Sequence, residues 1–295
     1  MRVSGLSINL QSYNIIHNTS NRYNKILMQQ SSGMKIQKGH EDPVLAQKAI
    51  SLQNTLKANE QYLKNINDAK STLDFTESIF SQASDMLTRA RELAIQASTD
   101  TINSESREAI VKEFDQLILE FVNMGNQQHN GKYIFAGTNT TTKPFEIVGN
   151  PPDSVIYHGN NNDISYNILD NYNLSTNVTG DRSFEMIINN MISVRNDIRD
   201  GNLDAVSKDG LESLDKTIDS VINIRTELGA KSKIVEATLE RVKTLDLETT
   251  AAYSELMGVD IAEKSIEAAG VELSYQASLS VVGKLYEMSL LNYMK

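Results

Sequence analysis

The chain has 295 residues and a net charge of −10, so it can bury a sizeable core, and its acidity disfavours binding to nucleic-acid phosphates. It contains no cysteine, which excludes disulfides, thiolate metal sites and cysteine nucleophiles. The first thirty residues show no Sec signal peptide, and no stretch approaches the roughly 20 apolar residues of a membrane span. These features predict either a cytosolic protein or one exported without a cleaved signal.

An amphipathic helix is predicted at the N-terminus. Its apolar residues recur at helical spacing. They are Leu6, Leu10, Tyr13, Ile16, Tyr23 and Leu27. Chain ends are usually polar and frayed, so an apolar stripe here indicates contact with a partner.

A long helix is predicted from Asp42-Pro43 to about Ala97. Aspartate is a favourable N-cap, and proline at the first helical position loses no hydrogen bond. Two rows of apolar residues recur at steps of seven or fourteen. They are Leu52, Ile66, Leu73, Phe80, Leu87 and Ala94, and Ala69, Ala83, Ala90 and Ala97. About 55 residues at ~1.5 Å each predict a rod on the order of 80 Å long. Asn59 and Thr76 interrupt the seam and are expected to fix its register.

A second helix and a small β-rich insert follow. The helix carries an apolar face that includes Ile110 and Phe121, and Gly125-Asn126 is expected to end it. Short β-type runs then occur at residues 133–135, 145–148, 155–157 and 164–168, separated by turns rich in glycine, asparagine and proline.

Helices return after the insert. One runs from Ser183 to a stop at Gly201, and a longer one continues from about Leu211 through Leu245. Gly258 is a predicted joint, after which Asp260-Ile-Ala-Glu263 has the spacing of a capping box. The last helix carries an apolar face at steps of three or four residues. Its members are Ala262, Ile266, Ala269, Leu273, Ala277, Val281, Leu285, Met288 and Leu291.

The predicted fold is mainly α: a long antiparallel helical rod or coiled-coil bundle built from both chain halves, with a small inserted β domain and terminal assembly helices. Five segments are expected. Residues 1–42 form an N-terminal assembly helix that pairs with the C-terminal assembly helix at 259–295. Residues 43–131 and 183–258 form the two halves of the rod, and residues 132–182 form the β-rich outer domain.

The terminal stripes predict an assembly interface. Two thin helices paired with each other still leave apolar surface, and contiguous apolar surface usually marks an interface. The residues expected to make assembly contacts are Leu6, Leu10, Tyr13, Ile16, Tyr23, Leu27, Ile266, Leu273, Ala277, Val281, Leu285, Met288 and Leu291. We hypothesise that these ends are unfolded or loosely helical in the monomer and become ordered on assembly.

The sequence shows few residue patterns that are typical of catalytic or metal-binding sites. The four histidines lie in unrelated settings without a second metal ligand at a usual spacing, and no nucleotide-binding or nucleophile motif occurs. His40-Glu41-Asp42 could suggest acid–base chemistry, but Pro43 favours a capped turn before the long helix. The sequence therefore predicts no catalytic, cofactor or metal site.

Several segments carry a family likeness. Gln30-Ser-Ser-Gly33, Asp42-Pro43 and Leu273-Ser-Tyr-Gln-Ala-Ser-Leu279 resemble the bacterial flagellin family. Ile224-Arg-Thr-Glu-Leu-Gly-Ala230 and Met288-Ser-Leu-Leu-Asn-Tyr-Met294 are similar to later parts of the same pattern. Asn130-Gly-Lys-Tyr-Ile-Phe-Ala-Gly137 with Pro144-Phe145 resembles the hook–filament junction branch of the family rather than flagellin proper. His40-Glu41 departs from the acidic pair that is usual before this proline, which changes only a capping neighbourhood.

The resemblance implies an extracellular structural protein of the bacterial flagellum, exported unfolded through the flagellar type III channel. It implies a ring of copies between the first hook-associated protein and the first flagellin subunits, with the termini in the innermost layer. It also implies an export chaperone on the C-terminal helix before secretion. No enzyme activity, cofactor, nucleic acid or membrane insertion is implied.

Three alternatives remain open at this point. A flagellin filament subunit differs only in its place in the structure. A wall hydrolase or other enzyme would need a carboxylate or metal site, which the sequence does not offer. A secreted helical adhesin would use the β insert and would not need its termini.

Overall fold

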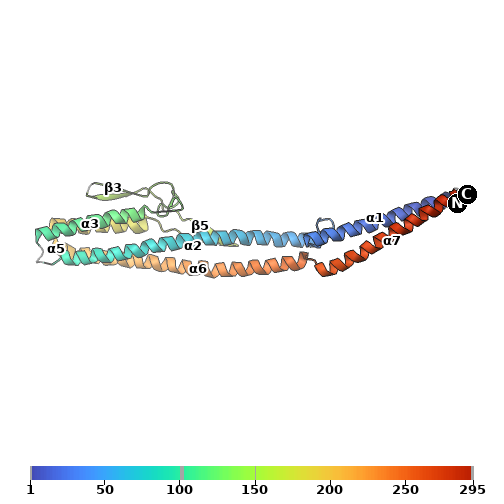
Figure 1. Cartoon of the computed structure of the whole chain (residues 1–295). Helices are drawn as coiled ribbons and strands as arrows, with labels where there is room; N and C mark the ends of the chain where they lie inside the picture. Colours follow the sequence, from blue (N-terminus) through green and yellow to red (C-terminus); the bar gives the residue numbers. More distant parts are fainter. Residues whose placement is uncertain (1, 100–102, 150, 294–295) are drawn as a thin grey trace. The chain divides into compact units, whose positions relative to one another are not determined.

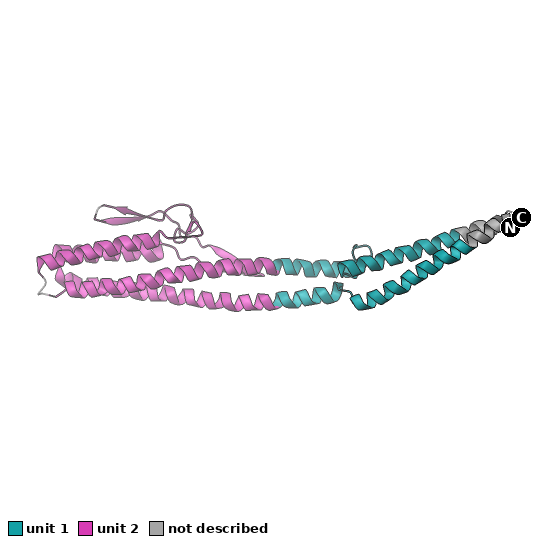
Figure 2. Ribbon diagram, viewed as in Figure 1, with its two compact units in different colours: residues 1–58, 245–295 teal, residues 59–244 magenta. Residues whose placement is uncertain are grey.

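The computed structural model describes the backbone of residues 2–99, 103–149 and 151–293, and the side chains of these residues outside 2–9 and 285–293. The chain forms two compact units, which Figure 2 shows in different colours. Unit 1 contains residues 1–58 and 245–295, and unit 2 contains residues 59–244. Unit 1 is therefore formed by the two ends of the chain, and unit 2 is formed by its continuous middle part.

Unit 2 is built on two long antiparallel helices, α2 (Pro43–Ala97) and α6 (Leu211–Met257), which lie side by side in Figure 1. Three ion pairs fix their direction, because rising numbers in α2 meet falling numbers in α6. The pairs are Lys70–Glu236 at 3.0 Å, Glu77–Arg225 at 2.8 Å and Arg91–Asp215 at 2.6 Å. The predicted pairing of long helices from both chain halves is confirmed.

Heptad seams hold these two helices together. Residues from Ile66 to Ala97 of the predicted α2 rows are buried, whereas Leu52 is half-buried. The facing row of α6 repeats every seven residues and is buried at Leu214, Val221, Leu228, Val235 and Val242. The polar interruptions are buried as well. Thr76 donates its hydroxyl to the Thr72 carbonyl at 2.7 Å, while Asn59 Nδ2 has no partner among the described residues.

Shorter helices complete the bundle. They are α3 (Ser104–Gly125), a π-helical turn η1 (Asp181–Glu185) that leads into α4 (Met186–Asp200), α5 (Leu203–Ala205) and a second π-helical turn η2 (Val206–Gly210). The predicted stops are confirmed: Asn126 caps α3, and Gly201 ends α4 with φ 78°, a left-handed value that glycine adopts without strain.

Three antiparallel two-stranded hairpins occur here, the first of which begins before the predicted insert at residues 132–182. They are β1 (Gln128–His129) with β2 (Lys132–Tyr133), β3 (Phe145–Val148) with β4 (Ser154–Tyr157), and β5 (Ser165–Leu169) with β6 (Tyr172–Ser175). The runs predicted at 145–148, 155–157 and 164–168 are confirmed. The run at 133–135 forms strand only as far as Tyr133, and the sequence did not predict β1 or β6.

Aromatic side chains tie the insert to the helices. Phe184 of η1 packs against Phe80 of α2, Phe135 and Phe145, with ring centroids 5.6, 4.7 and 6.3 Å apart. Tyr157 lies beside this cluster, and its hydroxyl is 2.9 Å from the Phe135 carbonyl oxygen. Burial raises the pKa of Tyr157, so its hydroxyl stays protonated and available as a donor. The insert and the helices therefore share one core.

Unit 1 contains α1 (Arg2–Ser32) and α7 (Ile261–Tyr293), together with the first turns of α2 and the last turns of α6. A short antiparallel bridge joins its segments: the Lys35 N–H donates to the Met257 carbonyl at 2.7 Å, and the Val259 N–H to the Gly33 carbonyl at 3.1 Å. Gly258 is the joint between α6 and α7, as predicted. The Asp260 carboxylate then accepts from the Ala262 and Glu263 N–H groups at 2.8 and 3.1 Å.

Candidate assembly surface

Helices α1 and α7 pack along a narrow seam (Figure 1). Ile26, Ala268 and Val271 form its buried apolar cluster, with Tyr23 packed against it. Ser12 is also buried. Because most of these side chains are small, the two helices can approach each other, but they remove little apolar surface from water.

Polar contacts add to this seam. Glu267 of α7 accepts from Arg22 of α1 at 2.9 Å and from Lys264 at 2.6 Å, and Gln30 donates to Ser265 at 3.0 Å. The hydrogen bond from Lys264, followed by that from Arg22, holds the pKa of Glu267 below its ordinary value of 4.5. These groups set the register of the two helices, although exposed ion pairs contribute little to stability.

Most of the predicted assembly residues lie on the outer faces of this helix pair. Leu10, Tyr13 and Leu27 of α1 are exposed, at 57, 65 and 40%. Ile266, Leu273 and Val281 of α7 are exposed as well, at 76, 69 and 57%. Ala277 is exposed, Ile16 and Tyr23 are half-buried, and only Tyr23 packs into the buried cluster. The predicted residues Leu6, Leu285, Met288 and Leu291 have side chains outside the described residues.

The seam also leaves space between the helices. A groove of about 390 Å³ is lined by Ser12 and Ile15 of α1 and by Ala277, Ser278 and Val281 of α7. A second groove of about 510 Å³ lies beside Arg22, Glu267 and Gly270. The first groove combines small and apolar side chains, so a side chain of another helix can pack into it, whereas the lining of the second groove is mostly polar.

A further exposed apolar set in unit 1 was not predicted from the sequence. Val44 and Ile50 of α2 are 66 and 56% exposed, and Leu247 of α6 is 71% exposed. They lie outside the heptad rows, and this was the available signal: an apolar residue off the seam of a coiled coil has no partner within the pair.

No group of three or more His, Cys, Asp and Glu side chains that could hold a metal ion occurs in the part of the chain that the structure describes. Three histidines have local partners there. His17 contacts Asn21 at 3.2 Å, His129 contacts Ser71 at 3.0 Å and His158 contacts Glu146 at 2.9 Å. None of the helices described is both long enough and apolar enough to cross a membrane.

Comparison with known proteins matches both ends of the chain. The model of the bacterial flagellin N-terminal helical region matches residues 3–140, and that of the bacterial flagellin C-terminal helical region matches residues 211–294. Flagellar hook-associated protein 3 of Escherichia coli (strain K12) is 24% identical over 98% of this chain and 100% of its own length. A flagellin of Bacillus subtilis (strain 168) is 24% identical over 96% of either chain. The crystal structure of Bacillus cereus FlgL covers 70% of this chain and 99% of that chain, at 29% identity and a TM-score of 0.58.

Proposed function

Because the chain belongs to the bacterial flagellin family, we propose that it is a hook-associated protein 3 that joins the flagellar hook to the filament. It is a structural protein of this family and not an enzyme. The observation that carries the proposal is the pair α1–α7, which turns Leu10, Ile266 and Leu273 toward solvent. A pair with so small a buried cluster needs neighbouring subunits to cover its outer faces.

Side-by-side packing of helices is the proposed mechanism. Complete burial of one leucine or isoleucine side chain contributes about 1.5–3 kcal/mol, so a few such contacts per subunit hold a copy in place. The grooves between α1 and α7 receive side chains of the next copy. In this proposal residues 1–42 and 259–295 are the assembly segments, residues 43–131 and 183–258 the helical support, and residues 132–182 the outer domain.

The partners follow from this position. The chain works within the flagellum, where we propose the first hook-associated protein on the hook side, flagellin on the filament side, and further copies of itself in a ring. The outer faces of α1 and α7 supply these contacts, because they are the most exposed apolar helix faces in unit 1 together with Val44 and Leu247.

An export route and an export chaperone are also part of the proposal. We propose that the chain leaves the cell unfolded through the flagellar type III channel and works outside the cell. An export chaperone covers the apolar face of α7 around Ile266 and Leu273 before secretion. A chain without cysteine suits this route, because it can unfold and refold without any disulfide to reduce.

Flagellin is the second candidate, because the matched family models describe flagellin regions and a flagellin shares the same 24% identity with this chain as hook-associated protein 3 does. Residues 130–137 argue for the junction protein. This segment supplies strand β2 and places Phe135 in the core of unit 2, so in this chain it anchors the outer domain.

Immunogold electron microscopy of intact flagella separates the candidates. Antibody against this chain is expected to label one narrow band between hook and filament. Label along the whole filament would identify a flagellin, and flagella without label would return the question to a secreted adhesin.

A charge on the outer face of α7 tests the surface itself. Leu273→Asp is expected to reduce incorporation into flagella at least tenfold, because assembly would bury a carboxylate. Leu273→Met keeps the apolar character and is expected to assemble normally. Both proteins are expected to show the urea transition of the unchanged chain. Normal incorporation of Leu273→Asp contradicts the assignment.

A further inference from the structure

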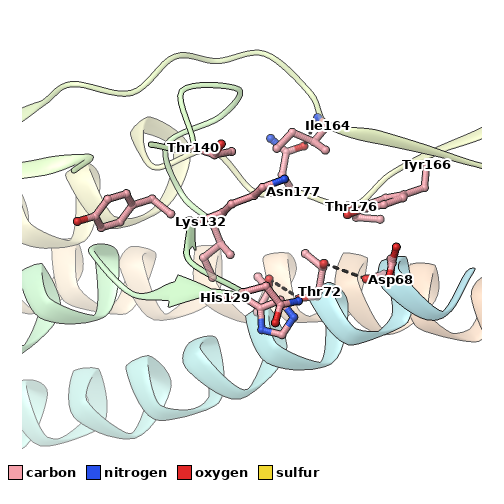
Figure 3. Close-up of a pocket in the computed structure, with 13 residues that line it drawn as sticks. Asp68, Thr72, His129, Lys132, Thr140, Ile164, Tyr166, Thr176 and Asn177 are labelled. Carbon is pink, nitrogen blue, oxygen red and sulfur yellow. Dashed lines mark hydrogen bonds between the residues drawn. The ribbon is translucent and has the colours of Figure 1, made fainter. Parts of the chain in front are cut away.

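Two hairpins pack on one face of α2 in unit 2. Asn65 of α2 donates to the carbonyl of Asn167 in β5 at 2.7 Å, and Ser71 of α2 contacts His129 in β1 at 3.0 Å. Figure 3 shows His129 and Tyr166 of these hairpins on the same side of α2. On this face of α2, polar side chains therefore have partners within the chain.

The same face of α2 continues into unit 1, where its residues are apolar. Val44 and Ile50 precede Asn65 and Ser71 by three heptads, so they take the same positions around the helix. Their exposed fractions are 66 and 56%. Large apolar side chains that remain this exposed on a helix of an assembling protein indicate a contact with another molecule.

Helix α6 presents a second exposed apolar point in unit 1. Leu247 is 71% exposed, and Ala251 and Glu255 follow it at steps of four residues, so the three share one ridge of the helix. Ala251 is exposed as well, and its small side chain permits the close approach of another helix. This ridge therefore has the shape of a helix-packing site.

The two segments carry opposite charges. Residues 43–58 of α2 contain lysine but no acidic residue, and residues 245–257 of α6 contain acidic residues but no lysine or arginine. The exposed charged residues are Lys48 and Lys57 on α2, and Glu248 and Glu255 on α6. None of these four forms an ion pair within the part of the chain that the structure describes, whereas three ion pairs join α2 to α6 in unit 2. A partner of opposite charge can pair with each segment.

We propose that a second copy of this chain docks here, with the α2 segment of one copy packed on the α6 segment of the next. The α2 patch consists of Val44, Lys48, Ile50 and Lys57, and the α6 patch consists of Leu247, Glu248, Ala251 and Glu255. The inference rests on the proposed ring of copies and names a contact within it. Because the two patches differ, the contact is heterologous, and repetition of a heterologous contact builds a ring when the rotation closes.

The positions of the charges along the helices agree with this contact. Gln53 of α2 donates to Tyr253 of α6 at 2.8 Å, so these two residues are level within one copy. Counting along the antiparallel helices from this pair places Lys57 level with Glu248, and Lys48 level with Glu255, each to within one helical turn. Rotation about an axis along the helices preserves these levels, so lysines of one copy meet glutamates of the next.

Cross-linking in intact flagella tests the contact. The chain has no cysteine, so Lys57→Cys and Glu248→Cys introduce its only thiols. In cells that produce both single variants, a short bis-maleimide is expected to give a dimer that antibody against this chain detects on a denaturing gel. Each single variant alone is expected to stay monomeric, because like patches do not meet in a heterologous contact.

A matched lysine supplies the control for position. Lys64 is exposed and lies one heptad beyond Lys57, about 10 Å further along α2. Cells that produce Lys64→Cys together with Glu248→Cys are expected to give at least fivefold less dimer than those with Lys57→Cys and Glu248→Cys.

Exchange of the charges tests the same pair without a cross-linker. Lys57→Glu and Glu248→Lys are each expected to reduce incorporation into flagella at least threefold, because each brings like charges together between copies. The double variant Lys57→Glu/Glu248→Lys is expected to restore more than half of the normal amount, which two independent folding defects would not do. Lys64→Glu is expected to leave incorporation unchanged.

Antibody labelling of the same flagella separates this inference from the proposed function. A chain that is incorporated at the junction but gives no dimer between the two variants overturns the contact and leaves the junction role standing. Single variants that dimerise as strongly as the mixture also overturn it. A dimer between the variants in flagella labelled along the whole filament supports the contact and overturns the junction role. Flagella that lack the chain overturn both.

Discussion

The two units bury apolar surface to very different extents. In unit 2, Phe80, Phe135 and Phe184 are completely buried and belong to one continuous core that runs from the seam of α2 and α6 into the insert. In unit 1, the buried apolar cluster between α1 and α7 comprises, among the side chains that the structure describes, Ile26, Ala268 and Val271. Helices draw most of their stability from tertiary packing, so unit 2 can hold its fold alone, whereas α1 and α7 depend on what assembles around them.

The two units also differ in how deeply their ion pairs are buried. Arg195 of α4 is completely buried in unit 2, pairs with Asp115 of α3 at 2.5 Å and donates to the Pro152 carbonyl. In unit 1, the pair Arg22–Glu267 lies at the surface. Unit 2 places one guanidinium inside its core, whereas the pair Arg22–Glu267 of unit 1 aligns α1 and α7 at the surface. Each prediction below tests this difference.

Truncation of a core aromatic is expected to have the largest effect. Phe184→Ala removes contacts with three other rings and is expected to lower the free energy of unfolding by about 3–5 kcal/mol. Urea denaturation followed by far-UV circular dichroism measures it. The matched change in unit 1, Val271→Ala, is expected to leave this transition in place and to accelerate amide hydrogen exchange in α1 and α7. Equal shifts by the two variants would contradict the comparison.

Removal of the carboxylate that pairs with the buried Arg195 is the next test. Asp115→Ala leaves the guanidinium of Arg195 buried without a counter-ion and is expected to destabilise unit 2 by about 3–5 kcal/mol in urea denaturation. The double variant Asp115→Ala/Arg195→Met removes the uncompensated charge and is expected to recover most of the loss. If the double variant is less stable than Asp115→Ala, the charge is not the cause. Arg22→Ala in unit 1 is expected to leave the same transition unchanged.

The sequence predicts the helices well because their signal is local. Seven-residue repeats, the Asp42-Pro43 start and the Gly258 joint all act within a few residues, and each is confirmed. The contact of Phe184 with Phe135 joins residues far apart in the chain, which periodicity does not report. Strand β6 was missed because Tyr172-Asn-Leu-Ser175 is half polar and pairs only with β5.

The sequence predicts which residues of α7 share one apolar face, but it does not predict which face of α7 points away from α1. A helical repeat shows that Ile266, Leu273 and Val281 share a face, yet it does not say which face meets α1. In the structure Ala268 and Val271 take the inner seam, because small side chains permit close approach, and the larger residues remain outside. Val44 and Leu247 were not predicted as part of the surface because they follow no repeat.

Substitution of one glycine in each unit tests the same difference in packing, with smaller expected changes in stability. Gly137 in unit 2 has φ 64°, and a Cβ there would lie 2.1 Å from the Asn160 carbonyl oxygen. Gly137→Ala is therefore expected to destabilise unit 2 by more than about 1 kcal/mol in urea denaturation.

Gly270 in α7 has no atom within 4 Å of such a Cβ. Gly270→Ala is expected to slow hydrogen exchange in α7, with a gain of about 0.5–1 kcal/mol. Destabilisation by both variants would mean that α7 is packed as tightly as the insert.

Acidification is expected to have the smallest effect and to reach unit 1 first. The pKa of Glu267 is lowered in the folded chain by Lys264 and Arg22, so its contribution to stability is present above its ordinary value of 4.5 and is lost as the pH falls through the lower folded pKa. Glu108, Glu212 and Glu227 in unit 2 also have lowered pKa values, but the core of unit 2 can absorb their loss. Below about pH 4.5, Cα chemical shifts in α1 and α7 are therefore expected to move toward coil values before those of α2 and α6. The pKa of Glu41 in unit 1 is also lowered, by the hydrogen bond from Lys25, so in Glu267→Gln the early step is expected to become smaller but to persist in part. If α2 and α6 respond at the same pH as α1 and α7, the two units do not differ in stability, and the dependence of the terminal helices on assembly has to be abandoned.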